Sequence, residues 1–152
     1  MPMPVANSYF VSKCGVLSHN AGKKKKKCEP PKRGGAYGKV RSDNAGGEVH
    51  HMPSKAAIDD GVPKLTKGTG PAIWMRTRDH RKTRSISKKG DGGAGTAYVE
   101  QQKELLKKNM WCRAINMDLR DVRKIHRTRY NLYIDDYLEY VAFVTKRICK
   151  GF

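Results

Sequence analysis

The sequence predicts an α+β protein in which a short hairpin and a helix are backed by a three-helix C-terminal region and preceded by a disordered basic tail. Three observations support this fold class. Apolar residues recur at helical spacing after residue 96, short strand-like segments alternate with turns between residues 36 and 95, and the first 38 residues are rich in proline, glycine and lysine. We therefore expect a tail or connector at residues 1–38 and one folded domain at residues 39–152.

The tail is expected from its composition. Residues 1–38 include four prolines, the adjacent Gly34 and Gly35, and five consecutive lysines at positions 23–27. A segment of this kind buries too little apolar surface to offset the entropy lost on ordering. The lysine run is expected to add nonspecific affinity for phosphate groups.

The four cysteines form no Cys-x-x-Cys pair, so nothing supports a zinc ribbon or a thioredoxin-type motif. Cys14 and Cys28 flank the lysine run and could form a disulfide in an oxidising compartment. Cys112 and Cys149 lie in apolar-patterned segments and are predicted to be small core residues.

The middle of the chain is predicted to form short elements. Residues 36–40 are a candidate strand, and a second apolar stretch follows at residues 70–75. Ser54 is expected to cap a short helix at residues 55–60, which Gly61 ends. The glycine-rich residues 91–95 predict a hinge.

Residues 96–152 are predicted to form three helices, each with its apolar positions on one face. These positions are Tyr98, Gln102, Leu105 and Leu106; Trp111, Ile115, Leu119, Val122 and Ile125; and Ile134, Leu138, Val141 and Ile148. Thr96 is the expected N-cap of the first helix. Asp118 and Asp121 are expected to form local ion pairs with neighbouring arginines.

The net charge constrains the partners of this chain. It carries 32 Lys+Arg against 14 Asp+Glu, a formal net charge of +18. Such a surface suits nucleic acid first, an anionic membrane surface second and an acidic protein third. No apolar run approaches the roughly 20 residues needed to span a bilayer, which excludes an integral membrane protein. Residues 1–94 hold 20 Lys+Arg and 7 Asp+Glu, so we expect the polyanion-binding surface there and the C-terminal helices as packing support.

Three histidines could carry chemistry. His50 and His51 are adjacent, and His80 follows Asp79 further along the chain. On an extended segment, adjacent side chains point in opposite directions, so one histidine can hold a metal while the other faces a water molecule. Phosphodiester hydrolysis needs a base and a cation, and these histidines could supply both functions. The nearby basic side chains that could bind phosphate oxygens are Arg76, Arg78, Arg81, Lys82 and Arg84.

The order Glu-x-His-His-x-Pro, then Gly-Pro-Ala-Ile, then Asp-His-x-x-Thr-x-Ser resembles that of small HNH-like (His-Me finger) nuclease domains. These domains form the C-terminal tips of bacterial polymorphic toxins, which include Rhs, contact-dependent and type VI secretion effectors. The resemblance continues through a Tyr-x-x-Gln pattern and a leucine pair and covers about residues 47–140.

This resemblance implies a set of site residues and partners. By position, His51 looks like the general base and His50 like a metal ligand. His80 looks like the catalytic ligand on the following helix, with Asp79 beside it as a further ligand or orienter. The implied cofactor is a divalent metal ion, Mg²⁺ or Zn²⁺, and the implied function is a metal-dependent endonuclease toxin that cuts DNA rather than RNA.

A toxin of this class also implies a cognate immunity protein, which we expect to be acidic because opposite charge speeds and tightens binding. The implied location is the cytoplasm of a target cell, reached as a delivered effector. Residues 1–10 lack the basic-then-apolar order of a secretory signal peptide, so another carrier is expected.

Two other functions fit the same residues. A metal-independent ribonuclease toxin would use His51 and His80 as a base–acid pair and would be insensitive to EDTA. A basic nucleic-acid-binding protein without catalysis would need only the tail lysines and the arginine run. Membrane-surface binding through lysines 23–27 is a weaker alternative, because no amphipathic helix with large apolar residues lies beside them.

Overall fold

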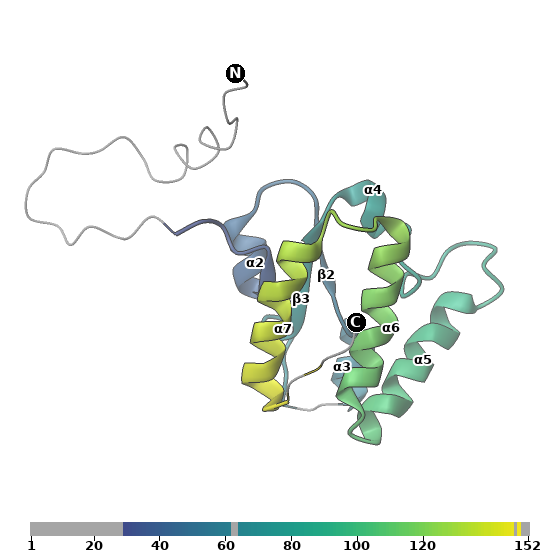
Figure 1. Ribbon diagram of the computed structural model, residues 1–152. Coiled ribbons are helices and arrows are strands. Elements are labelled where there is room, and N and C mark those ends of the chain that lie inside the picture. Colours follow the sequence, from purple (N-terminus) through teal and green to yellow (C-terminus); the bar gives the residue numbers. More distant parts are fainter. Residues whose placement is uncertain (1–28, 62–63, 148, 150–152) are drawn as a thin grey trace, which may run out of the picture. The chain divides into compact units, whose positions relative to one another are not determined.

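Figure 1 shows the computed structural model, which describes residues 29–61, 64–147 and 149. The helices and strands of the described residues belong to one unit, Lys32–Phe152. Residues 1–28, for which disorder was expected and in which Cys14 and Cys28 could form a disulfide, lie outside the described residues. Among the residues that are described, no helix is long and apolar enough to cross a membrane.

The sheet has three antiparallel strands in the order β1-β3-β2, namely β1 (Gly34–Ala36), β2 (Glu48–His51) and β3 (Pro71–Met75). β3 is central, and its side chains are accordingly apolar and mostly buried. It begins with a proline, whose missing N–H is tolerated at the first position of a strand. The register places Glu48 opposite Met75 and His50 opposite Ile73.

Helices surround this sheet, which confirms the α+β class (Figure 1). The predicted three-helix C-terminal region corresponds to α5, α6 and α7; α7 packs against β1 and β3, and α5 packs against both α3 and α6. Sheet and helices share one core, whose largest fully buried side chains include Tyr130, Tyr137 and Met52. The helices are α2 (Tyr37–Asp43), α3 (Lys55–Gly61), α4 (Thr77–His80), α5 (Ala94–Lys107), α6 (Trp111–Ile125) and α7 (Asn131–Thr145).

The folded unit begins earlier than composition predicts. Residues 34–38, assigned to the tail by their glycines, form β1 and the start of α2, and only Ala36 of the expected strand at residues 36–40 is extended. A Cβ atom on Gly34 would lie 2.0 Å from the carbonyl oxygen of Tyr133 in α7. The glycine is therefore needed because the backbones of β1 and α7 pack directly against each other.

Helix caps were predicted correctly for one helix and wrongly for another. Ser54 caps α3, because the backbone N–H of Ala57 donates to Ser54 Oγ at 3.3 Å. Thr96 does not cap α5, which begins two residues earlier. The turn before α5 is instead held by the carboxylate of Asp91, and the expected hinge is a hydrogen-bonded loop. This carboxylate accepts hydrogen bonds from the backbone N–H groups of Lys88, Gly93 and Gly95.

The two C-terminal cysteines form a disulfide with each other, with Cα atoms 5.2 Å apart. Cys112 and Cys149 were expected to be small core residues; Cys149 does pack against the core, but the pairing of the two was not predicted. Both are only half-buried. The bond joins the first turn of α6 to the segment that follows α7, two places that are 37 residues apart in the sequence.

A buried polar cluster connects α5 to α6. Asp118 is fully buried, and it accepts hydrogen bonds from the Tyr98 hydroxyl at 2.8 Å and from Gln102 Nε2 at 2.6 Å. The expected local ion pair of Asp118 with a neighbouring arginine is therefore wrong, because its partners are Tyr98 and Gln102. Burial raises the pKa of Asp118 to about 7, and its two hydrogen bonds oppose this shift only in part. The neighbouring Asp121 accepts a hydrogen bond from the backbone N–H of Arg84 at 2.8 Å.

Replacing Gly34 by alanine is expected to destabilise the fold by about 1–3 kcal/mol, because the added methyl group meets a helix backbone that cannot rotate away. The matched control is Gly68→Ala, where the nearest atom, Thr66 Oγ1, is 3.9 Å from the added Cβ. Chemical denaturation measures both. Equal stabilities of the two variants would contradict the close packing of β1 on α7.

Replacing Asp118 by asparagine is expected to change how stability depends on pH. The folded-state pKa of Asp118 is raised, so its favourable contribution is complete below pH about 4 and is lost as the pH rises to about 7. Relative to the wild type, Asp118→Asn should therefore gain roughly 1.4 kcal/mol of stability per pH unit across this window. Urea titrations at several pH values measure this difference, and a difference that does not vary with pH would contradict the buried carboxylate.

Candidate active site at the junction of β2 and α4

Side chains from β2 and α4 meet on one side of the sheet. Glu48 and His50 are two positions apart on β2, so they point to the same side. α4 begins two residues after β3 ends, and this short connection brings His80 beside β2. The rings of His50 and His80 meet edge to face with centroids 5.2 Å apart. Glu48 forms an ion pair with Nδ1 of His80.

His50 is buried without a polar partner. Its side chain belongs to a residue that is 3% exposed, and Nε2 has no hydrogen-bond partner among the described residues. Burial, together with the nearby His80 and His51, lowers the pKa of His50 from 6.5 to about 3. The ring is therefore neutral at physiological pH. In the tautomer with hydrogen on Nδ1, Nε2 presents a free lone pair, which makes it a candidate ligand atom.

Glu48 orients the ring of His80. Its carboxylate contacts Nδ1, although this contact is not aligned as a hydrogen bond. A carboxylate at Nδ1 favours hydrogen on that atom and leaves Nε2 as the acceptor. Carboxylates orient metal-bound and catalytic histidines in the same way. The side chain of His80 is 19% exposed, so the site reaches the surface through this residue.

These donors match a divalent metal ion only in part. Within the described ranges, no three His, Cys, Asp or Glu side chains form a group that could enclose an ion. His50 and His80 offer two imidazole nitrogens, which suit a transition metal such as Zn²⁺ better than Mg²⁺. An ion held by these two residues would need water or phosphate oxygens to complete its coordination.

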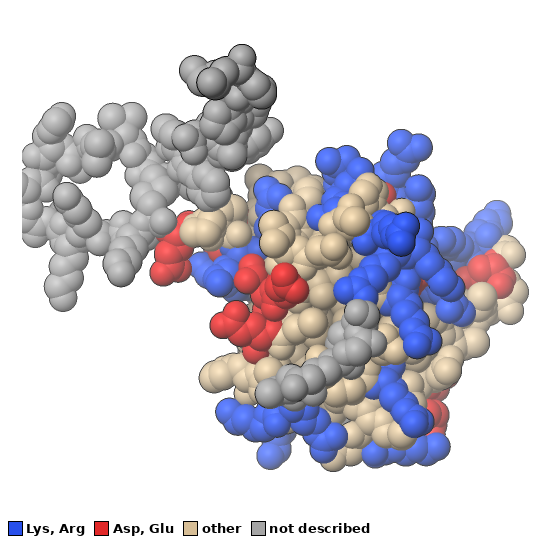
Figure 2. Space-filling model, viewed as in Figure 1, with Lys and Arg blue, Asp and Glu red and all other residues tan. Residues whose placement is uncertain are grey.

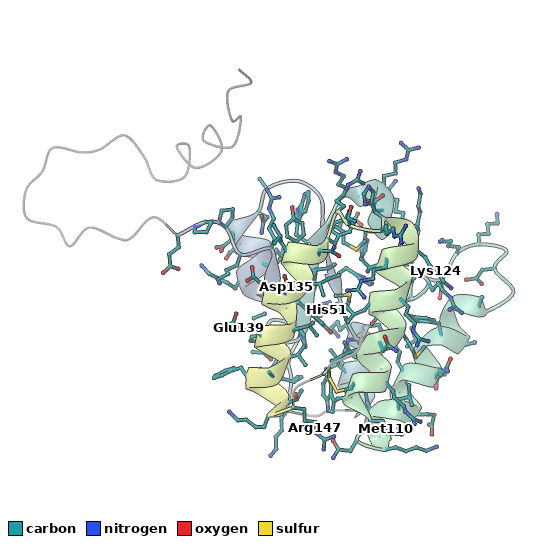
Figure 3. The ribbon with its side chains drawn as sticks, viewed as in Figure 1. His51, Met110, Lys124, Asp135, Glu139 and Arg147 are labelled. Carbon is teal, nitrogen blue, oxygen red and sulfur yellow. A yellow bond between two sulfur atoms is a disulfide. The ribbon has the colours of Figure 1, made fainter. Side chains whose placement is uncertain are left out.

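His51 lies on the opposite side of β2 from His50. Its ring stacks on Tyr37 with centroids 4.2 Å apart and an interplanar angle of 8°, and Nε2 donates to the carbonyl oxygen of Lys67 at 3.0 Å. Burial lowers the pKa of His51, partly offset by this carbonyl. Figure 3 labels His51 in the middle of the unit. The structure thus brings His50 and His80 together and places His51 elsewhere.

Asp79 anchors α4 from behind the site. Its carboxylate is buried and accepts hydrogen bonds from the Tyr130 hydroxyl at 2.5 Å and from Arg129 Nη1 at 2.8 Å. Burial alone would raise the pKa of Asp79, but these two hydrogen bonds and the guanidinium charge lower it. The Tyr130 hydroxyl also accepts a hydrogen bond from the backbone N–H of Arg76 at 3.1 Å. Asp79 therefore fixes the helix that carries His80.

The predicted phosphate-binding side chains flank His80 on α4 and on the turn after it. Arg76, Arg78, Arg81, Lys82 and Arg84 are all exposed. Figure 2 shows Lys and Arg side chains gathered over α4. Arg84 differs from the rest, because its guanidinium lies 4.9 Å from the centre of the Tyr98 ring, as in a cation–π contact.

A groove of about 400 Å³ lies between β1, α2 and α7, and its lining includes Lys39, Asp136, Glu139 and Phe143. None of the residues predicted from the sequence to form the site lines this groove. It has carboxylates on its wall, which repel phosphate. The groove therefore does not support a nucleic-acid site, in contrast to the basic surface around His80.

Sequence reasoning missed three residues that shape this site: Glu48, Arg129 and Tyr130. Glu48 could have been found, because a residue two positions before His50 on a strand shares its side. Arg129 and Tyr130 follow α6, about 50 positions after Asp79. No local pattern links positions so distant, so only the packed structure could show their contact.

Comparisons with known protein families, with characterised proteins and with solved structures found no significant match to this chain. The resemblance to HNH-like toxin nucleases therefore rests on the sequence motifs alone.

Because the hydrogen bonds to Asp79 hold α4 in place, we expect Tyr130→Phe to lower folding stability more than Tyr140→Phe does. Tyr130→Phe removes one hydrogen bond from a buried carboxylate and should cost about 1–3 kcal/mol of folding stability. Tyr140→Phe is the matched control, because the Tyr140 hydroxyl bonds the carbonyl of Thr69 at an exposed position. Thermal and urea unfolding measure both variants. A loss at Tyr140 as large as that at Tyr130 would contradict the anchor.

Proposed function

We propose that this protein is a metal-dependent endonuclease toxin that hydrolyses nucleic-acid phosphodiester bonds, in DNA in preference to RNA. One observation carries the proposal: a buried, neutral His50 without a partner on Nε2 lies beside His80, which Glu48 orients. His50 and His80 would hold the ion. A bound divalent ion would supply positive charge at the reacting phosphate and would lower the pKa of a water molecule.

The contacts of His51 support a role as general base less than the contacts of His50 and His80 support metal binding. Its Nε2 is engaged by a carbonyl, so Nδ1 is the ring atom that could accept a proton. Its ring also stacks on Tyr37, on the side of β2 away from His80. The motif suggests His51 as the base, but its position away from His80 does not support that role, and we expect its substitution to be less damaging than that of His80.

The oriented Glu48–His80 pair also supports one alternative, hydrolysis without a metal ion. In this reaction His80 Nε2 would take the proton of the attacking group, while Glu48 stabilises the charged ring. The alternative pairs His80 with Glu48 and not with His51, because the two histidines lie on different sides of β2. Sensitivity to EDTA distinguishes this reaction from the proposed one.

The proposal extends to partners. Exposed arginines beside His80 would hold the substrate backbone, because one guanidinium group can donate two parallel hydrogen bonds to phosphate oxygens. A cognate acidic immunity protein would cover the same basic surface, and the protein would act as a delivered effector in the cytoplasm of a target cell. The charge of +18 favours both partners.

The test is cleavage of plasmid DNA and total RNA with and without EDTA. Wild-type protein should cut DNA in the presence of Mg²⁺, Mn²⁺ or Zn²⁺, and EDTA should abolish cutting. His80→Ala should lower the rate about 100-fold or more. Glu48→Gln should lower it by about 10–100-fold, the usual effect of losing a carboxylate that orients a metal-bound histidine.

His19→Ala is the control, because this histidine belongs to none of the motifs, and it should cut like the wild type. Cutting that persists in EDTA would exclude the metal and support the Glu48–His80 alternative. A wild type that cuts neither nucleic acid with any of the three metals would contradict the nuclease proposal and leave a binding protein without catalysis.

A further inference from the structure

α6 carries one face on which most of the exposed side chains are basic. We name it the α6 basic face; its members are Arg113, Arg120, Arg123, Lys124 and Arg127, the last just beyond the helix end. At 3.6 residues per turn the four positions within the helix fall within an arc of about 100°, which also contains the half-buried Asn116. All are exposed except Arg123, which is half-buried. Sequence reasoning assigned this helix to packing support, and its other side does pack into the core.

The two acidic residues of α6 do not balance this charge at the surface. Asp118 and Asp121 are buried on the side of α6 that faces the core. Asp118 bonds Tyr98 and Gln102, and burial raises its pKa to about 7, so it is partly protonated near neutral pH. Asp121 is bonded to the backbone of Arg84. The charge of the exposed face is therefore almost entirely positive.

The side chains of the α6 basic face have few partners within the part of the chain that is described; Lys124 interacts electrostatically with Asp121. None of them forms a hydrogen bond or an ion pair through its charged group. Like charges three or four residues apart destabilise a helix by about 0.2–0.5 kcal/mol per pair, and Arg120 repels both Arg123 and Lys124. This arrangement costs stability in the free protein, and a polyanion bound along the face would offset that cost.

The α6 basic face continues the arginine cluster around His80. Figure 2 shows Lys and Arg side chains over α4 and along α6, while acidic side chains gather over α7. Figure 3 places Lys124 at the upper end of α6 and Glu139 on the opposite side of the view. Two contacts fix the two basic areas relative to each other: Arg84 N–H to Asp121, and Arg129 to Asp79.

We propose that the α6 basic face binds the phosphate backbone of duplex DNA beyond the site at His80. The inference rests on the proposed function for the identity of the polyanion. From Arg113 to Lys124 the helix rises about 16 Å, a length over which one DNA strand presents about five phosphates. The face is linear, so it suits a continuous backbone better than a single phosphate group.

The test measures binding without cleavage. A short fluorescent DNA duplex is titrated in EDTA at several salt concentrations with the wild type, with Arg120→Gln/Lys124→Gln/Arg127→Gln, and with the matched control Lys39→Gln/Lys64→Gln/Lys108→Gln. Both variants lose three charges from exposed positions. The α6 variant should bind more weakly, and the slope of log Kd against log salt should be shallower by about 2–3. The control should keep the wild-type slope.

Equal slopes for the α6 variant and the control would overturn the proposal, as would a wild type that does not bind the duplex. A competing RNA hairpin that binds better than the duplex, with the same loss in the α6 variant, would also overturn the assignment to DNA. Binding in EDTA does not depend on cutting. A wild type that binds through α6 but never cuts would therefore support this inference while contradicting the nuclease proposal.

Discussion

The position of α4 depends on one buried carboxylate, Asp79. The helix is only four residues long, far below the length at which a helix is stable by itself. Hydrogen bonds from Tyr130 and Arg129 to Asp79, and from Arg76 to the Tyr130 hydroxyl, hold it against the start of α7. Because His80 ends this helix, the same contacts fix its ring beside Glu48 and His50.

The protein buries two ionisable groups, His50 and Asp118, in forms that favour neutrality, and this follows from their packing. Burial favours an uncharged imidazole at His50 and a protonated carboxyl at Asp118. The two effects act in opposite directions on stability as the pH changes. Between about pH 4 and 6.5, the unfolded state binds the proton of His50, whereas the folded state binds the proton of Asp118. In this range the two contributions to the pH dependence largely cancel.

Exposed charges differ in sign between α6 and α7, although both helices contain acidic residues. On α6, the acids turn inward and the arginines outward. On α7, the acids Asp135 and Glu139 are exposed. Most of the net charge does belong to residues 1–94. The expectation that the C-terminal helices only provide packing support, however, treated Asp118 and Asp121 as surface charges that offset the basic residues of α6. Only their burial shows that the C-terminal half also presents a basic face.

The sequence by itself determined the α+β class, the three C-terminal helices and the cap at Ser54, because each follows from periodicity or local hydrogen bonding over a few residues. It also indicated which histidines to examine, and alternation along a strand correctly separated His50 from His51. Only the tertiary structure shows that Gly34 allows β1 to pack closely on α7 and that Cys112 and Cys149 form a disulfide. The same is true of the hydrogen-bond partners of Asp79 and Asp118. These features join residues between 16 and about 100 positions apart, and their energies depend on burial, which no local pattern encodes.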